Sequence, residues 1–344
     1  MICGGPPCQG FSTIGTGNVD DERNHLFLEF LRFVEYFNPS YILIENVTGL
    51  LAKKNTDTLI SILDSFDKLG YFLDVRVLTA SHFGVPQARR RVIFVGNNLG
   101  IENRFPNKKY NNPNENLPSL KKSRTVGWAL DKLITLRNKA YNHDIEEAEI
   151  KSNIEKARIG LVPEGRSIRY ERDEKEFLPK ELRFGIDWNK ISEKRFREAK
   201  YSRLNRELPS PTIVTNRKMY YHPTEDRYLT QRGAAAMQSF PANFKFEGSL
   251  SKQWTQIGNA VPPLMAEEIG KSLIEMNKNR RKKVKHNKSR DIELLRSFAF
   301  KYDKDTFDNM SIQQELPLSS LKGFKDRFQK IKDRFQETLH SLFH

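Results

Sequence analysis

Hydrophobic and polar residues alternate with two different periods along the first 96 residues. Apolar residues recur every three or four positions in two stretches, which is typical of helices with one buried face. Short apolar runs rich in β-branched residues predict buried parallel strands. The predicted helices cover residues 20–37 and 57–69, the second ending at Gly70, and the predicted strands cover residues 41–45, 71–80 and 92–95. This alternation predicts an α/β fold with an open parallel sheet and helices on both faces.

The pattern weakens after this first region. Asn and Lys become frequent, Pro is scattered, and only residues 125–136 show a clear helical period. We interpret this part as a second, smaller domain of irregular structure with short strands. Further helices are predicted over residues 230–240 and 265–276. The expected organisation is a catalytic α/β domain (1–96), a second domain (97–225), a return segment that completes the first domain (226–276), and a basic linker with an amphipathic extension (277–344), whose apolar period covers 321–343.

Composition supports a folded core and a polyanionic partner. The chain has 344 residues, 38% of them hydrophobic and 23 of them Phe. Lys and Arg number 58 against 43 Asp and Glu, which gives a formal net charge of +15. Such an excess suits a nucleic acid. Because residues 278–290 hold eight basic and no acidic side chains, the rest of the chain is only mildly basic. Charge alone is therefore weak evidence for DNA binding.

Few cysteines and scattered histidines exclude several classes of protein. The 2 cysteines, Cys3 and Cys8, cannot form a disulfide framework, and a reducing cytoplasm fits them. The 7 histidines are scattered and no Cys-x-x-Cys occurs, so no metal site is expected. No apolar run is long enough to span a bilayer, and no signal peptide is recognisable.

The stretch from Gly4 to Ser12 reads Gly-Gly-Pro-Pro-Cys-Gln-Gly-Phe-Ser and follows a short strand. Glycines allow unusual backbone angles, whereas the two prolines fix φ and remove N–H donors. The result is a stiff loop that holds Cys8 in one direction. Stiffness around a nucleophilic atom indicates a chemical site, although a lone cysteine is more often a buried structural residue.

Charged side chains follow other predicted strands. Glu45 ends the strand 41–45, so Glu45 and Cys8 both lie beyond the carboxyl ends of strands, where open α/β sheets bind ligands. A carboxylate facing solvent is the alternative. Arg89 and Arg91 alternate with Arg90, so both face one side of an extended segment. The alternative for these arginines is a solvated run of charge.

Five stretches, in order over about residues 1–275, are similar to motifs of the DNA cytosine-5 methyltransferases. One match could arise by chance, whereas five in order are very specific. The resemblance implies a Rossmann-like parallel sheet of the class I methyltransferase type, N-terminally incomplete, with a smaller target-recognition domain at residues 97–225. The matching stretches are Pro6–Ser12, Glu45–Val47, Gln87–Arg91, Arg227–Thr230 continuing into Gln238–Pro241, and Gln256–Pro263.

The resemblance implies methyl transfer from S-adenosylmethionine to carbon 5 of a cytosine flipped out of double-stranded DNA, in a restriction-modification setting. Cys8 would be the covalent nucleophile, and Glu45, protonated by burial, the proton donor to the ring. Arg89 and Arg91 would hold the target base and the Cys8 loop. The resemblance assigns Pro7, Asn259 and Val261 to the methyl donor, and Gln9, Ser12, Thr212, Thr215, Arg217 and Arg227 to DNA. It implies a cytoplasmic, nucleoid-associated protein.

Two features depart from the family pattern. The family's Phe-x-Gly-x-Gly loop and the acidic residue after it, which hold the donor, do not occur in these 344 residues, and Gly233 stands where the family usually has Glu. The chain is then one subunit of a split methyltransferase with a separate N-terminal subunit, a fragment of a longer protein, or an inactive copy. The intact motifs favour the first two. A non-catalytic sequence-specific DNA-binding subunit and a tRNA cytosine-5 methyltransferase remain alternatives. The large middle domain favours duplex DNA.

Overall fold

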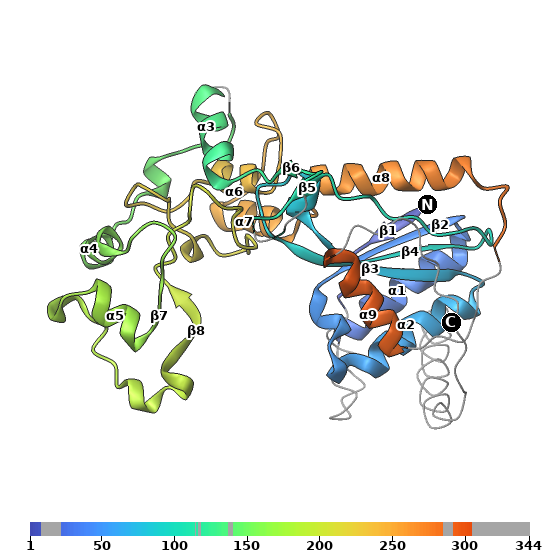
Figure 1. Cartoon of the computed structure of the whole chain (residues 1–344), viewed down its shortest axis with the longest axis horizontal. Helices are drawn as coiled ribbons and strands as arrows, with labels where there is room; N and C mark the ends of the chain where they lie inside the picture. Colours follow the sequence, from blue (N-terminus) through green and yellow to red (C-terminus); the bar gives the residue numbers. More distant parts are fainter. Residues whose placement is uncertain (8–21, 114, 116–117, 137–139, 285–291, 305–344) are drawn as a thin grey trace, which may run out of the picture. The chain divides into compact units, whose positions relative to one another are not determined.

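The computed structural model describes residues 1–7, 22–113, 115, 118–136, 140–284 and 292–304 (Figure 1). By contacts between its residues the chain divides into two compact units, and each is described here by itself. Unit 1 comprises Met1–Leu78, Arg91–Phe105 and Ser272–His344, and unit 2 comprises Thr79–Arg90 and Pro106–Lys271.

Unit 1 is built on a four-stranded sheet in the order β1 (Ile2–Gly4), β2 (Tyr41–Asn46), β4 (Arg90–Asn97) and β3 (Phe72–Thr79). The strands β1 and β2 are parallel, whereas β2 and β4 are antiparallel. The predicted all-parallel sheet is therefore wrong, and the sheet is mixed. The reason lies in the connection between β3 and β4, residues 80–89, which contains only a short 3₁₀ turn. Parallel neighbours need a longer crossover, usually through an α-helix.

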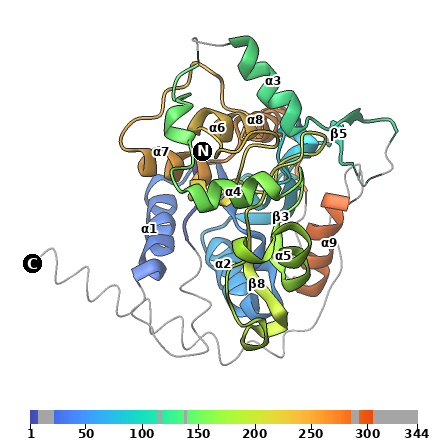
Figure 2. The same ribbon diagram turned by 90° about the vertical axis from the view of Figure 1, so that its left-hand side faces the viewer.

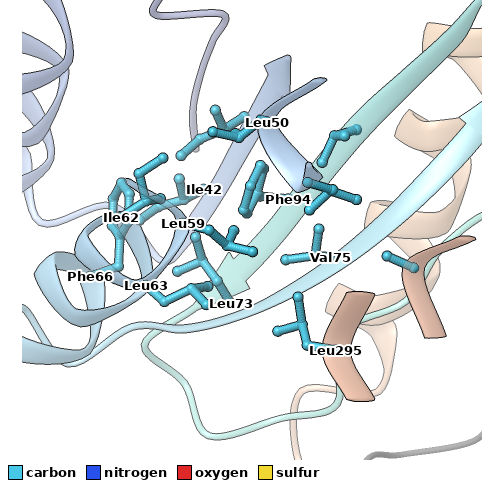
Figure 3. Close-up of a cluster of buried hydrophobic side chains, with 14 of the residues drawn as sticks. Ile42, Leu50, Leu59, Ile62, Leu63, Phe66, Leu73, Val75, Phe94 and Leu295 are labelled. Carbon is cyan, nitrogen blue, oxygen red and sulfur yellow. The ribbon is translucent and has the colours of Figure 1, made fainter. Parts of the chain in front are cut away.

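Three helices cover one face of this sheet (Figure 1), and all three are labelled again in Figure 2: α1 (Glu22–Phe37), α2 (Thr56–Lys68) and α9 (Ile292–Lys304). Their apolar sides meet the sheet in a single core, in which Phe66, Val75, Phe94 and Leu295 are buried (Figure 3). The predicted helix end at Gly70 is confirmed by its left-handed φ of 83°. The helix α9 was not predicted, because its apolar residues follow a strongly basic segment. The predicted amphipathic stretch 321–343 lies outside the described residues.

Unit 2 contains two hydrophobic clusters. The first is formed by α3 (Val126–Leu136), α6 (Gln231–Met237) and α7 (Leu250–Asn259), with Trp254 at its centre. The second lies around the β7–β8 pair. The short strands confirm the irregular structure predicted for this region, whereas α4, α5 and α7 were missed because they are short or rich in polar residues. The remaining elements are β5 (Tyr110–Asn111), β6 (Lys121–Lys122), α4 (Asn153–Leu161), β7 (Ile168–Tyr170), α5 (Glu171–Phe177), β8 (Arg195–Lys200) and α8 (Pro263–Lys278), which passes from unit 2 into unit 1.

The return segment, residues 226–276, was expected to complete the first domain, but most of it groups by contacts with unit 2. Residues 226–271 belong to unit 2, together with most of the middle region, and only the end of α8 belongs to unit 1. Side-chain hydrogen bonds show why: Arg232 donates to the carbonyl of Tyr141, and Gln231 donates to the carboxylate of Glu147. Within the described residues, no helix has the length and apolar character needed to cross a membrane.

Candidate active site

Glu45 and Arg91 form an ion pair at the carboxyl end of β2. Because β2 and β4 run antiparallel with Glu45 opposite Ile93, Arg91 at the start of β4 lies beside the end of β2. The Arg91 Nε is 2.8 Å from Glu45 Oε1, and the two side chains keep 14% and 20% of their surface exposed. Burial lowers the pKa of Arg91, while the neighbouring Glu45 carboxylate opposes that shift. A guanidinium thus lies against the Glu45 carboxylate, and its protonation by burial stays a prediction.

The loop after β1 is fixed against the same strand end. The Asn46 side chain donates from Nδ2 to the carbonyl of Pro6 at 2.9 Å and accepts at Oδ1 from the backbone N–H of Val47. A Cβ added at Gly5 would lie 3.2 Å from Glu45 Oε2. A side chain at this position would therefore require the Glu45 carboxylate to shift by a few tenths of an ångström. The chain thus reaches Pro7 in a defined position next to a charged pair.

Several predicted site residues lie outside the described residues, namely Cys8, Gln9 and Ser12. Pro7, the last described residue before them, is partly buried. Their assigned roles stay predictions.

Gln87 holds the segment before β4 to the segment 211–217 within unit 2. Gln87 is fully buried, accepts at Oε1 from the backbone N–H of Ile213 (3.1 Å) and donates from Nε2 to the carbonyl of Met237 (3.2 Å). Backbone hydrogen bonds join Ala88 N–H to the Ser210 carbonyl and Ser210 N–H to the Pro86 carbonyl. We call this arrangement the Gln87 clasp. The sequence indicated Gln87 only as part of the stretch Gln87–Arg91. It did not predict the hydrogen bonds to the backbone of Ile213 and Met237.

Arg89 belongs to the same clasp. It is 2% exposed, and its Nη1 donates to the carbonyl of Ile213 at 3.2 Å. Arg90 is exposed, whereas Arg89 is buried and Arg91 partly buried. Exposure thus alternates along this segment, while the expectation that Arg89 and Arg91 face one side stays a prediction. Arg91 meets Glu45 and Arg89 meets Ile213, so the two arginines have different described partners.

The predicted DNA-contacting residues of segment 211–217 differ in exposure. Thr215 is exposed, Thr212 is partly buried, and the carbonyl of Thr212 accepts a short hydrogen bond from the Tyr220 hydroxyl. Burial raises the pKa of Tyr220 to about 12, so this hydroxyl stays a donor at neutral pH. Arg217 is partly buried and donates to the carbonyl of Glu147 at 2.7 Å.

Arg227 is held by internal contacts. Its guanidinium pairs with both carboxylate oxygens of Glu225, at 2.8 and 3.0 Å, and donates to the carbonyl of Tyr228. The side chain is 12% exposed. These contacts fix the course of the chain into α6 and leave little of Arg227 accessible.

The turn after α7 contains the residues assigned to the methyl donor. Asn259 is exposed at the last position of α7, and Val261 is partly buried. The preceding Gly258 packs against the backbone of segment 211–217: a Cβ there would lie 2.6 Å from Thr215 N and from the Val214 carbonyl carbon. The role of Gly258, close packing against the backbone of segment 211–217, could therefore be found only from the structure. No group of three or more potential metal-ligating side chains occurs among the described residues.

Comparison with known proteins agrees with the sequence resemblance. The family model "C-5 cytosine-specific DNA methylase" matches residues 1–275. The Type II methyltransferase M1.HphI of Haemophilus parahaemolyticus is 34% identical over 291 residues, which cover 81% of this chain and 69% of that protein. The Type II methyltransferase M.NgoFVII of Neisseria gonorrhoeae is 33% identical over 290 residues, covering 83% and 72%. The chain therefore belongs to the C-5 cytosine-specific DNA methylase family.

A solved structure supports the fold independently. A DNA modification methyltransferase encoded within an E. coli prophage superposes with a TM-score of 0.54 at 23% identity, covering 80% of this chain and 79% of that chain. At this identity the likeness concerns the fold alone. It agrees with an α/β architecture around a mixed sheet.

Proposed function

We propose that this protein is a DNA cytosine-5 methyltransferase of a restriction-modification system, acting through the Cys8 loop and the Glu45–Arg91 pair. The observation that carries the proposal is the family match over residues 1–275 together with the ion pair beside the loop that leads to Cys8. We further propose that its fold is of the class I methyltransferase type and that unit 2 contains the target-recognition domain.

Carbon 5 of cytosine is a weak nucleophile, so the ring has to be activated. The Cys8 thiolate forms a bond to carbon 6, and the displaced electron pair moves toward carbon 5 while nitrogen 3 takes a proton. S-adenosylmethionine, when bound, supplies the methyl group that carbon 5 accepts. The hydrogen on carbon 5 then leaves as a proton to water, the electron pair left on carbon 5 expels the Cys8 thiolate from carbon 6, and nitrogen 3 returns its proton to Glu45.

Glu45 is the group proposed to give the proton to nitrogen 3. Its Oε1 already accepts from Arg91, whereas Oε2 faces the position of Gly5, where no side chain is present. Oε2 is therefore the oxygen proposed to reach the base. Arg91, which pairs with this carboxyl group, is proposed to orient it and to contact the carbonyl oxygen of the ring. Arg89, held against Ile213, is proposed to position the adjoining segment.

The residues assigned to the methyl donor have chemistry that suits it. Asn259 presents an exposed carboxamide, which donates and accepts hydrogen bonds, while Pro7 and Val261 present partly buried apolar surfaces. These residues would hold only part of such a molecule. We propose that residues not contained in this sequence supply the rest of the donor site, either on the same polypeptide or on a separate one. The Phe-x-Gly-x-Gly loop does not occur in these 344 residues.

For DNA contact, Thr212 and Thr215 are the better supported residues of segment 211–217, because Thr215 is exposed and Thr212 partly exposed. Arg217 and Arg227 are engaged in internal hydrogen bonds, so we propose that they hold the DNA-contacting surface in shape. Gln9 and Ser12 are proposed to contact DNA beside the flipped base.

The test is transfer of labelled methyl from S-adenosylmethionine to duplex DNA. We expect transfer that is lost in Cys8→Ala, either with this chain alone or after addition of a second polypeptide that carries the Phe-x-Gly-x-Gly loop. Transfer that survives Cys8→Ala would contradict the assigned nucleophile. DNA binding without transfer under both conditions would instead favour a non-catalytic DNA-binding subunit.

A further inference from the structure

Five cations lie close together where α8 ends in unit 1: Lys278, Arg280, Arg281, Lys282 and Lys283. We call them the basic turn. All five side chains belong to exposed residues. They lie just beyond the part of the chain that matches the family, which ends at residue 275, and none of them has a role in the reaction proposed above.

The basic turn, the first part of the predicted basic linker, is joined to unit 1 by backbone and side-chain hydrogen bonds. The backbone N–H of Val284 donates to the carbonyl of Gly100 at 2.9 Å, and Lys283 forms an isolated β-bridge with Ile101. The Lys283 ammonium also donates to the carbonyl of Leu99 at 2.7 Å. These contacts join the turn to the loop that follows β4 (Figure 1).

Anchors on both sides of the turn hold it in place. On the amino-terminal side, Asn277 accepts from the Tyr41 hydroxyl at 2.8 Å. Further along, α9 packs into the core through Leu295, and Arg296 donates to the Thr56 hydroxyl at 2.6 Å. Binding at a fixed loop costs less conformational entropy than binding at a mobile one. A ligand that binds the cations of the basic turn would therefore have to order little of the chain.

The basic turn lies at the opposite end of the sheet from Glu45. Tyr41, which contacts Asn277, begins β2, and Glu45 stands near its end. Tyr41 pairs with Asn97 and Asn46 with Val92, so the loop after β4 also lies at the amino end of β2. At about 3.3 Å per residue, the two ends of β2 are about 17 Å apart. The turn and the Glu45–Arg91 pair therefore lie at opposite ends of β2.

The charge of the turn is little compensated nearby. Among the described residues, one ion pair involves it, between Lys278 and Glu275 at 3.4 Å, with both side chains at least half exposed. Residues 278–290 carry eight of the chain's basic side chains and no acidic one, against a net charge of +15. More than half of the formal excess thus lies in this one segment.

We propose that the basic turn is a second DNA-binding surface, which binds phosphates of duplex DNA outside the target site and independently of base sequence. This rests on the proposed function, since duplex DNA is the polyanion with which such an enzyme works. Exposed Lys and Arg contacts to phosphate contribute sequence-independent affinity that falls steeply with salt. The surface would hold the protein on DNA while unit 2 encounters target sites.

The test compares two double variants of the full chain with the same loss of charge. Arg281→Gln with Lys282→Gln removes two cations from the turn, and Arg32→Gln with Lys68→Gln removes two exposed cations from α1 and α2 of the same unit. Binding to a duplex of mixed sequence is followed by fluorescence anisotropy between about 50 and about 200 mM salt. Thermal unfolding of each variant verifies that it folds like the wild type.

For the turn variant we expect the slope of log affinity against log salt to become shallower by about 1.8, with binding about tenfold weaker near 0.1 M salt. The α1–α2 variant should retain nearly the wild-type slope. Equal changes in both variants, or none in the turn variant, would overturn the proposal. So would loss of binding to phosphatidylglycerol vesicles in the turn variant with an unchanged DNA slope.

Labelled methyl transfer by the same preparations separates the two proposals. If the wild-type protein transfers no methyl under either condition described above, the proposed function fails, while the salt slope still reports on the turn itself. If methyl is transferred and the slope does not respond to the turn variant, the proposed function stands and the second surface does not.

Discussion

The Glu45–Arg91 pair of unit 1 and the Gln87 clasp of unit 2 use polar side chains in opposite ways. Glu45 and Arg91 are neighbours across two strands, keep part of their surface exposed, and leave Glu45 Oε2 facing a glycine. Gln87 is fully buried, and both ends of its carboxamide are occupied by backbone groups. The first arrangement keeps part of both charged side chains exposed, whereas the second encloses the Gln87 carboxamide completely.

The difference separates chemical groups from positioning groups. Removing a partly exposed charged group should affect reaction rate more than folding. Removing a buried carboxamide should lower the free energy of unfolding more than the reaction rate. Its backbone partners would then lose their hydrogen bonds in a place that water does not reach. The predictions below test this separation, from the largest expected effect to the smallest.

Glu45→Gln should lower the rate of methyl transfer by at least about a hundredfold, the usual effect of losing a general acid. The free energy of unfolding should change by only about 1 kcal/mol, because Gln keeps an acceptor for Arg91. Single-turnover kinetics and urea unfolding measure the two effects. A variant that folds normally and transfers methyl at the wild-type rate would remove Glu45 from the mechanism.

Gln87→Ala should destabilise unit 2 by about 3 kcal/mol, because the Ile213 N–H and the Met237 carbonyl lose their partner and a cavity remains. Gln256→Ala is the matched control, since Gln256 is exposed and donates to the carbonyl of Glu247. It should cost less than about 0.5 kcal/mol. Urea unfolding compares the two, and equal losses would show that the Gln87 clasp has no special role.

Gly258→Ala should destabilise the protein by about 2 kcal/mol, because the new methyl group would lie 2.6 Å from backbone atoms of Val214 and Thr215. Backbone atoms cannot move aside as a flexible side chain can. The segment 211–217 would shift, so DNA affinity should fall as well. Thermal unfolding and DNA binding test this, and an unchanged melting temperature would contradict the close packing.

Lowering the pH should weaken unit 2 through His222. Burial, aided by the charge of Arg227, lowers the pKa of His222 to about 4, below the ordinary 6.5. As the pH falls, His222 is protonated in the unfolded chain at a higher pH than in the folded protein. The contribution of neutral His222 to the free energy of unfolding is therefore fully present above pH 6.5 and is lost as the pH falls toward 4. The loss should be about 3 kcal/mol. His222→Asn, which keeps an acceptor, should flatten the pH dependence of the melting temperature in this window.

Gly270→Ala should stabilise the protein by about 0.5 kcal/mol, because Gly270 lies inside α8 and an added Cβ would meet nothing within 4 Å. It is the counterpart of Gly258→Ala, the same substitution in a helix of the same unit. Differential scanning calorimetry should show opposite shifts of melting temperature. Destabilisation by both would mean that helical glycines in unit 2 share a role unrelated to packing against segment 211–217.

The sequence predicted those parts of the molecule that depend on local pattern. The helix α2, its end at Gly70, and the strand ending at Glu45 follow from periodicity and from the left-handed preference of glycine. The alternation of Arg89, Arg90 and Arg91 follows from strand geometry. Strand direction does not, because the apolar run of β4 looks the same whether its neighbour is parallel or antiparallel.

The Gln87 clasp lay beyond sequence reasoning for a different reason. Its hydrogen bonds join residues 126 and 150 positions apart in the chain, and a single glutamine has no periodicity to reveal them. The role of Gly258 is hidden in the same way, since the backbone that it meets comes from segment 211–217. The hydrogen bonds of the basic turn were hidden as well, because its composition is that of a solvated charge run and its partners Leu99 and Gly100 are distant in the chain.

The most direct test measures methyl transfer and stability together in Glu45→Gln and Gln87→Ala. At a temperature where both variants are folded and with saturating DNA, we predict that Glu45→Gln keeps nearly the wild-type unfolding free energy and loses at least about a hundredfold in rate. Gln87→Ala should lose about 3 kcal/mol of stability and keep most of its rate per folded molecule. The reverse assignment, with Glu45 governing folding and Gln87 the chemical step, would contradict the account.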